Sequence, residues 1–479
     1  MADGTGPQLR PYQEACVDGL REAIRAGYRA PLLVSPTGSG KTVMFSHLAH
    51  RISGAGKRTV VIAHRDELVE QISLALRFER LQHGVISAQS RHYDFRLRTH
   101  VASVQTLVRR IEQIAPPDYL IIDEAHHCVL GTTWGKVVAR WLEKRPSMRV
   151  IGVTATPERL SGEGLGQVFD RMVLGPSTAD LIAAGWLSKY RLFAPPPRDA
   201  VDFSDVHSRG GDFVRSEVAG KIDKPTITGS ALAQYRKHCD GAPAVAFCTS
   251  IEHAVHVAET FAAAGYRAAS IDGTMDKDER RRIVASFRSG ALSVLTAADL
   301  ISEGFDVPGI VAGILLRPTQ SLALHLQQVG RCLRIAPGKE CAYILDHVGN
   351  WERHGLPDDE REWTLAGRDR KARKAKDPDD VVVKQCPSCY AISRALATRC
   401  SACGQVFPVK ARKVAEVEGE LQEIDASTVR RPVSEFAMSR QAARDLEALV
   451  KIGQARGMGN PEGWARHVLE AREAKRRRA

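Results

Sequence analysis

Residues 32–45 read LLVSPTGSGKTVMF, in which an apolar run is followed by a glycine-rich turn and then by residues with helical spacing. A turn between a strand and a helix presents backbone N–H groups and the positive end of the helix dipole to a phosphate. Lys41 would reach the β- and γ-phosphates of ATP, and the Thr42 hydroxyl would face Mg²⁺. The remaining residues expected around this nucleotide are Pro36, Thr37, Gly38, Ser39 and Gly40.

This turn departs from the strict phosphate-loop pattern at one position, because Ser35 stands where that pattern has its first glycine. Gly38 and Gly40 still allow the close backbone approach that a Cβ would block. The alternative is an ordinary strand-to-helix turn. A second site with matching chemistry elsewhere in the chain argues against that alternative.

That second site is YLIIDEAHH at 119–127, where an apolar run ends in two acidic residues. A buried strand that ends in carboxylates delivers them to the active edge of an α/β sheet. Asp123 would hold Mg²⁺, and Glu124 would orient and deprotonate the attacking water. A solvated acidic loop is the alternative. A metal site at His126, His127 and Cys128 is disfavoured because adjacent side chains point in different directions.

Short apolar runs alternate with helical patterns along most of the chain, which predicts an α/β fold with two tandem parallel sheets. The alternation pauses across YRLFAPPPRDAVDFSDVHSRGGDF, 190–213, where prolines, glycines and polar residues dominate, and resumes at AVAFC, 244–248. We expect the first domain at 1–193 and the second at 194–350. They are followed by a charged linker at 351–384, a cysteine-rich module at 385–410 and a helical basic tail at 411–479.

The 479 residues include 68 Lys and Arg against 56 Asp and Glu, a formal charge of +12 that favours an anionic partner. No apolar run approaches the roughly 20 residues that span a bilayer. The opening MADGTGPQLR has neither the basic start nor the apolar core of a secretion signal. We therefore expect a soluble, cytoplasmic protein that does not bind membranes.

Four of the ten cysteines lie in two CxxC pairs, CPSC at 386–389 and CSAC at 400–403. This spacing allows four thiolates to converge on one tetrahedral zinc ion. Four thiolates close the coordination shell, so the predicted Zn²⁺ is structural. Disulfide or reactive pairs are the alternative, which is disfavoured in a reducing compartment. The predicted ligands are Cys386, Cys389, Cys400 and Cys403.

The order of the motifs resembles that of superfamily 2 helicases. SPTGSGKT is followed by DEAH at 123–126 and TATP at 154–157, and the second half contains TAADLISEGFDVPGI at 296–310 and QQVGRCLR at 327–334. The resemblance covers roughly residues 8–350 and implies two RecA-like domains that close on ATP. It implies hydrolysis in the cleft between them, coupled to movement along a nucleic acid.

The resemblance also implies roles for individual residues. Gln13 would read adenine, and Arg331 and Arg334 would reach the γ-phosphate from the second domain. A basic helix face in water is the alternative for these arginines. Gln327, Gly304 and Asp306 would join the ATP site. Hydrolysis would be coupled to domain closure by His126, Thr154 and Thr156.

Other matching positions would contact the nucleic-acid backbone, because polar groups at strand ends can bind phosphates without reading bases. A lone Ser or Thr there is otherwise a helix cap. The predicted contacts are His64, Arg65, Ser103, Gln105, Thr106, Thr249, Ser250 and Thr296.

The subclass prediction comes from further matches and departures. The segment IAHRDELVEQ at 62–71 departs from the form found in DEAD-box RNA helicases. The chain instead resembles RadD-type bacterial DNA-repair ATPases and related phage helicases in three features: GFDVP, the LRPT before QQVGRCLR, and the cysteine-rich module. This resemblance favours DNA as the substrate, single-stranded or branched, and leaves RNA open. It also implies a role in repair or recombination, together with partner proteins. Two alternatives remain: an ATP-gated recruitment factor that does not unwind processively, and the motor subunit of a restriction system.

Overall fold

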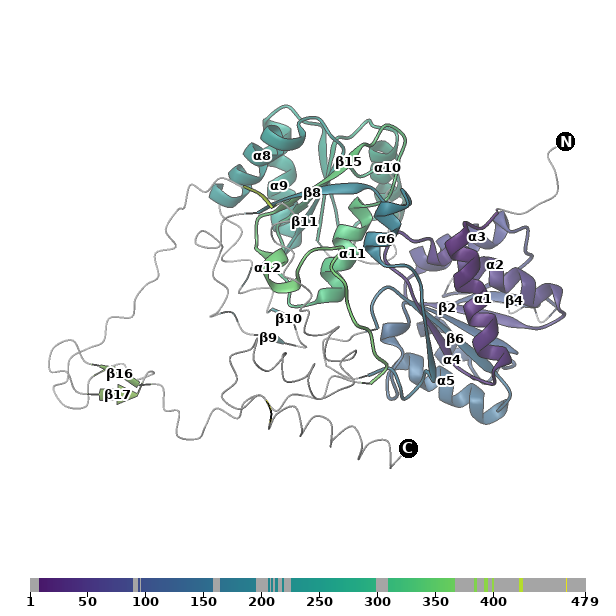
Figure 1. Ribbon diagram of the computed structural model, residues 1–479. Coiled ribbons are helices and arrows are strands. Elements are labelled where there is room, and N and C mark those ends of the chain that lie inside the picture. The colour runs from purple at the N-terminus through teal and green to yellow at the C-terminus, as the bar shows by residue number, and fades with distance from the viewer. Residues whose placement is uncertain are drawn as a thin grey trace.

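The computed structural model describes residues 8–88, 94, 96–157, 164–194, 206, 208–209, 212–213, 218, 225–298, 309–366, 383–385, 392–394, 399, 422–424 and 462. Within them the chain forms two α/β lobes, drawn in purple to blue and in teal to green in Figure 1. The predicted α/β class with two parallel sheets is confirmed. None of the described helices has the length and apolar character that a membrane crossing requires.

The first lobe contains a seven-stranded sheet in the order β3-β4-β2-β5-β6-β1-β7, and every pairing in it is parallel. The strands are β1 Pro31–Val34, β2 Thr59–Ala63, β3 Gly84–Ile86, β4 Thr99–Ser103, β5 Tyr119–Asp123, β6 Arg149–Thr154 and β7 Arg171–Leu174. The helices are α1 Pro11–Arg25, α2 Lys41–Gly54, α3 Asp66–Phe78, α4 Val104–Arg110, η1 Ala125–His127 and α5 Thr133–Lys144. Helix α6 Thr178–Ala183 follows β7 and packs its Leu181 on the second-lobe core.

Both faces of this sheet are covered, which explains why its strands are apolar runs without alternation. Leu120 and Ile122 of β5 point into the core under α4 and α5, whereas Ile121 points into the core under α1, α2 and α3. Figure 1 shows these helices on either side of the sheet. Parallel strands place their carboxyl ends at one edge, so the turns after β1, β2 and β5 lie together.

The second lobe has a sheet in the order β12-β13-β11-β14-β15-β8-β18. Its strands are β8 Lys189–Ala194, β11 Ala244–Cys248, β12 Ala268–Ile271, β13 Val294–Ala298, β14 Ala312–Leu315, β15 Cys341–Asp346 and β18 Gln422–Ile424. Its helices are α8 Pro225–Cys239, α9 Ile251–Ala263, α10 Lys277–Arg288, α11 Leu322–Cys332 and α12 Asn350–His354. Two short hairpins join β9 Ser208–Arg209 to β10 Asp212–Phe213 and β16 Val383–Gln385 to β17 Ile392–Arg394.

Three segments differ from what composition predicts. Strand β8 pairs with β15 in the second sheet, so the passage between the sheets lies before residue 189 rather than at 193. Part of the charged stretch expected as a solvated linker is packed: Trp363 and Leu365 contact the first-lobe core, and Gly166 N donates to Leu365 O at 2.9 Å. In the tail expected to be helical, residues 422–424 form an antiparallel edge strand beside β8.

Candidate nucleotide-binding site

The glycine-rich turn joins β1 to α2 as predicted, and its shape depends on glycine at two positions. Gly38 and Gly40 have positive φ angles of 89° and 81°. A Cβ on Gly40 would lie 2.4 Å from Gln13 Nε2, so a larger residue would displace that amide. Lys41 Nζ donates to the carbonyls of Ser35 and Pro36, each at 3.2 Å. The ammonium therefore lies inside the turn, where phosphate oxygens would compete for it.

The charges around Lys41 come from both lobes. Burial lowers the pKa of this ammonium, the carboxylates of Glu124 and Asp123 raise it, and the guanidinium groups of Arg334 and Arg331 lower it again. Residues predicted from three separate motifs thus act on one another electrostatically. Two acids and three bases around one turn can stabilise a polyphosphate and a divalent cation together.

The two acids lie at the end of β5. Burial and the neighbouring charge of Glu124 raise the pKa of Asp123, and Lys41 opposes this shift. Repulsion between two enclosed carboxylates is relieved by a divalent cation, so this donor set, with the Thr42 hydroxyl, fits Mg²⁺. Glu124 has φ 48° and ψ 51°, a left-handed conformation that is strained for a residue with a Cβ and is often found at active sites.

A continuous set of contacts leads from Glu124 to the end of β6. Glu124 Oε2 lies 3.4 Å from His126 Nδ1, which in turn lies 3.1 Å from Thr154 Oγ1. Thr154 Oγ1 donates to the Thr156 carbonyl at 2.9 Å and accepts from the Thr156 N–H at 3.2 Å. The three residues predicted to couple hydrolysis to closure are therefore linked to the predicted water-orienting carboxylate.

The second lobe reaches the glycine-rich turn through α11. A Cβ on Gly330 would lie 2.5 Å from Thr37 Cβ, so the helix backbone packs directly on the turn. The segment between the lobes reinforces this contact: Leu187 and Arg334 form a β-bridge, and Ser188 N donates to Leu333 O at 2.7 Å. Gln327 and Arg331 of the same helix are buried.

Gln13 also contacts the turn. Its Oε1 accepts from Arg10 N at 3.0 Å, and its Nε2 donates to Ser39 O at 3.0 Å. Tyr12 donates its hydroxyl to the same carbonyl at 2.8 Å. The amide therefore supports the shape of the phosphate turn, and adenine recognition by Gln13 stays a prediction.

The predicted nucleic-acid contacts divide into accessible and enclosed side chains. His64 and Arg65 are half-buried after β2, and Gln105 is exposed while its Oε1 accepts from Ser103 Oγ at 2.8 Å. Thr296 is fully buried and donates to Ala254 O at 2.6 Å, so only its backbone could reach a ligand in this conformation.

Three more predicted contacts have local structural roles. Ser250 caps α9 by accepting from His253 N at 3.1 Å, the alternative role expected of a lone serine. Thr249 is buried with its Oγ1 3.0 Å from His253 Nδ1, and Thr106 is buried as well. Gly304, Asp306 and the four predicted zinc ligands lie outside the described residues. Within the described part of the chain, no cluster of three or more His, Cys, Asp or Glu side chains could hold a metal ion, the His126–Cys128 group included.

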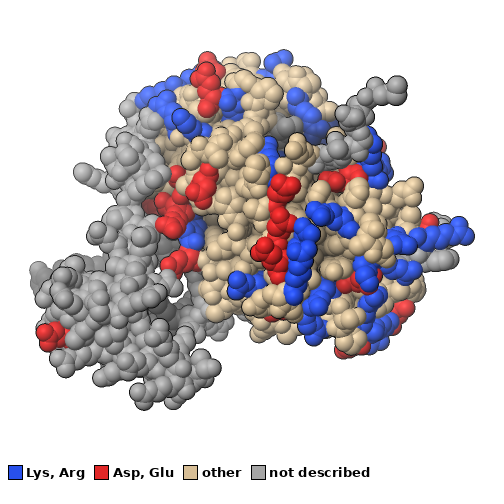
Figure 2. All heavy atoms as spheres, turned by 45° about the vertical axis from the view of Figure 1, so that its right-hand side comes forward, with Lys and Arg blue, Asp and Glu red and all other residues tan. Residues whose placement is uncertain are grey.

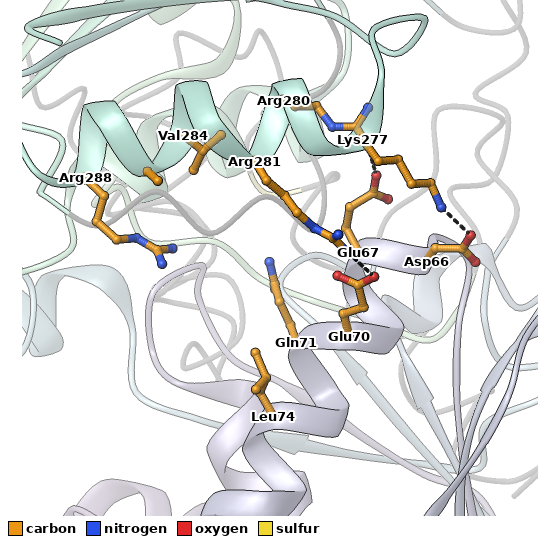
Figure 3. A pocket seen from close by; sticks show the side chains of 11 residues that line it. Asp66, Glu67, Glu70, Gln71, Leu74, Lys277, Arg280, Arg281, Val284 and Arg288 are labelled. Atoms are coloured by element: carbon orange, nitrogen blue, oxygen red, sulfur yellow. Dashed lines mark hydrogen bonds and ion pairs between the residues drawn. The ribbon is translucent and has the colours of Figure 1, made fainter. Parts of the chain in front are cut away.

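A second contact between the lobes was not expected from sequence. Helix α3 of the first lobe faces α10 of the second across a cavity of about 410 Å³, and Figure 3 shows acidic side chains on α3 pointing toward basic side chains on α10. We call this contact the α3–α10 seam. Its ion pairs are Lys277 with Asp66 at 3.1 Å, Arg281 with Glu70 at 2.8 Å, and Arg280 with Glu67.

The charge runs in DELVEQ and DKDERRR were the available signal for this seam, but nothing in their spacing indicates that these two helices face each other. On the face drawn in Figure 2, Lys and Arg side chains are spread among acidic ones.

Comparison with known proteins gives matches in both lobes. The family model "Type III restriction enzyme, res subunit" matches residues 6–159, and "Helicase conserved C-terminal domain" matches residues 229–336. A "51.5 kDa protein" of a Lactococcus phage is 32% identical over 437 residues, which are 90% of this chain and 90% of the phage protein.

Two further similar proteins carry more informative names. The ATP-dependent helicase IRC3 of Saccharomyces cerevisiae is 28% identical over 72% of this chain, and the match spans only 52% of IRC3. The solved fragment of an HsdR subunit of a type I restriction enzyme from Vibrio vulnificus has a TM-score of 0.58 at 20% identity, covering 74% of this chain and 67% of the fragment. This likeness supports the two-lobed fold.

Proposed function

We propose that this chain, which belongs to the superfamily 2 helicases and is an ATP-hydrolysing enzyme, uses ATP hydrolysis to move along DNA. The observation that carries the proposal is the charge cluster around Lys41, to which the first lobe contributes two carboxylates and the second lobe two guanidinium groups. A site divided in this way is complete only while the lobes are together. Hydrolysis can therefore alternate with lobe closure.

In this proposal each group acts on one phosphoryl transfer. Lys41 and the N–H groups of the turn bind the phosphates, and Asp123 with Thr42 would hold Mg²⁺, which neutralises charge on the phosphate oxygens. Glu124 orients the attacking water and accepts its proton. Arg331 and Arg334 stabilise the charge that develops on the transferred group.

DNA as the substrate is supported by two observations. The first-lobe match is to a restriction-enzyme subunit, and restriction enzymes act on DNA. Arg65 follows β2 at the same sheet edge as the ATP site and is half-buried, whereas the ring nitrogens of its neighbour His64 are enclosed in this conformation. Contacts of this kind bind the phosphate backbone, so affinity should fall steeply with salt and change little with base sequence. The RadD-type likeness and a role in repair stay predictions.

The decisive experiment is ATP turnover with single-stranded DNA, duplex DNA, forked DNA and RNA, for the wild type and Glu124→Gln. We expect DNA to stimulate the wild type, and Glu124→Gln to bind ATP while its turnover falls about 1000-fold or more. Stimulation by RNA alone would reject DNA as the substrate. Near-normal turnover in Glu124→Gln would reject the role of that carboxylate.

A second candidate function, the motor subunit of a restriction system, is favoured by the match of residues 6–159 to the res-subunit model. Co-purification with a methyltransferase would support it. An ATP-gated recruitment factor is the third reading, and it predicts DNA-stimulated turnover without displacement of a labelled strand from a partial duplex.

We also propose a structural Zn²⁺ at the four cysteines of 386–403. Strands β16 and β17 pair antiparallel and flank the first CxxC in sequence, an arrangement compatible with a small metal-bound hairpin. The role proposed for this module is contact with DNA or with a partner rather than phosphate chemistry.

A further inference from the structure

Three histidines and a tryptophan pack together beside the predicted water-orienting carboxylate. The ring centroids of His126 and His127 are 4.1 Å apart, and those of His127 and His64 are 5.1 Å apart. The ring of Trp134 lies 6.2 Å from that of His127 at an interplanar angle of 16°. The sheet explains this grouping, because β2 and β5 are neighbours and His64 and His127 follow their carboxyl ends.

Trp134 and His64, which both contact His127, differ in their surroundings. Trp134 is buried in the first-lobe core and forms a fixed wall. His64 is half-buried at the sheet edge with both ring nitrogens enclosed, and its neighbour Arg65 is a half-buried charged residue of a segment expected to bind the DNA backbone. A shift of this segment on DNA binding would reach His127 through the contact between the His64 and His127 rings.

The stack ends at the catalytic side of the same edge. His126, in ring contact with His127, has its Nδ1 3.4 Å from Glu124 Oε2 and 3.1 Å from Thr154 Oγ1. The position of the His126 ring therefore affects both the carboxylate and the end of β6. The ring of His127 contacts the rings of both His64 and His126.

We propose that His127 is a positioning residue that transmits DNA binding at the segment of Arg65 to Glu124 through its ring contacts with His64 and His126. The proposal rests on the proposed function, because it requires a DNA-stimulated ATPase. It differs from simple core packing in one respect. Packing affects turnover with and without DNA equally, whereas transmission affects the ratio of the two rates.

The test compares kcat for ATP with and without saturating DNA in the wild type, His127→Ala, His127→Asn and His127→Phe, with KM for ATP and Kd for DNA measured separately. We expect the stimulation ratio to fall about tenfold in the Ala and Asn variants and to be largely restored by Phe, which keeps a ring. His83→Ala is the matched control, because His83 contacts Ser73 and Leu81 away from this stack and should keep the wild-type ratio.

Three outcomes decide against the proposal. If the ratio of DNA-stimulated to basal kcat is unchanged in His127→Ala, even when both rates fall equally, the ring stack has only a packing role. If His127→Asn keeps the wild-type stimulation ratio and His127→Phe does not, a hydrogen bond of His127 rather than its ring contacts carries the coupling. If DNA does not stimulate the wild type, the proposed function fails first and the inference fails with it, so the two failures are distinguishable.

Discussion

Two of the contacts between the described parts of the lobes differ in their chemistry. At the nucleotide edge, the backbone of Gly330 packs on Thr37, and Arg331 and Arg334 act on the buried Lys41, so close steric fit brings enclosed charges together. At the α3–α10 seam, charged side chains meet around a cavity. Steric fit is lost abruptly when a lobe shifts, whereas ion pairs weaken gradually and are screened by salt. We infer that the nucleotide edge determines whether catalysis occurs, and that the seam adjusts how often the lobes are closed.

The largest effect should come from removing the charge that the second lobe brings to the nucleotide edge. We expect Arg331→Ala to lower kcat about 1000-fold while ATP still binds, because this guanidinium stabilises the transition state rather than the bound nucleotide. Single-turnover hydrolysis and equilibrium binding of ATP would separate the two quantities. Arg331→Lys, which keeps the charge without the planar fork, should recover only part of the rate. Unimpaired turnover in Arg331→Ala would remove α11 from the catalytic site.

A smaller loss should follow from adding one methyl group at the same contact. Gly330→Ala places a Cβ 2.5 Å from Thr37 Cβ and forces α11 away from the turn. A displacement of about 1 Å costs on the order of 100-fold in rate, so kcat should fall by that amount with little change in melting temperature. Gly54→Ala is the matched control, because it is also a helical glycine and a Cβ there meets nothing within 4 Å. Equal turnover in the two variants would show that the lobes need not meet at Gly330.

At the seam we expect a graded effect that a charge swap reverses. Arg280 is buried and pairs with Glu67, so Arg280→Glu sets like charges against each other and should lower DNA-stimulated turnover about tenfold. The double variant Glu67→Arg with Arg280→Glu should recover most of this loss. Arg282→Glu makes the same charge change on the exposed side of α10 and should have little effect. Failure of the swap to restore turnover would mean that Arg280 acts through something other than this pair.

The smallest change in basal turnover should follow from changes that touch neither contact. Both contacts are made by residues up to 334, so Cys400→Ser with Cys403→Ser should abolish bound zinc and leave basal ATP turnover within about twofold. Elemental analysis and limited proteolysis of residues 385–410 would accompany the ATPase assay. Retention of zinc in the double variant would exclude this ligand set. Loss of the whole fold would show that the module is integrated with the lobes.

The sequence predicts the site better than it predicts the contacts that complete it. Asp123 and Glu124 lie at the end of an apolar strand, and Lys41 begins the helix that follows another. Parallel strands bring their ends to one edge, so local pattern is sufficient. The role proposed for His127 could not be predicted from local pattern, because it depends on a ring contact with His64, which is far away in the sequence. The α3–α10 seam was missed for the same reason: charge runs on two helices do not reveal which helices face each other.

Two segments were assigned to the wrong structural context, because neither strand pairing nor local packing can be deduced from composition. YRLFA is expected to be part of the irregular stretch between the domains because prolines and polar residues follow it, but residues 189–194 form β8, which joins the second sheet. The charge around residues 351–366 predicts solvent exposure, whereas Trp363 and Leu365 supply enough apolar surface to pack on the first lobe. Tertiary burial of a few large side chains outweighs the average polarity of such a stretch.

The pairing of β18 with β8 has a consequence for how the chain can be shortened. Residues 422–424 cover the outer side of residues 192–194, and β15 covers the inner side. A chain ending before Gln422 would leave a row of unpaired N–H and C=O groups, the kind of edge onto which a strand from another molecule can add. Only Lys189 and Arg191 would discourage such addition. Removing the tail to isolate the motor would therefore produce a protein prone to edge-to-edge self-association, even with an intact ATP site.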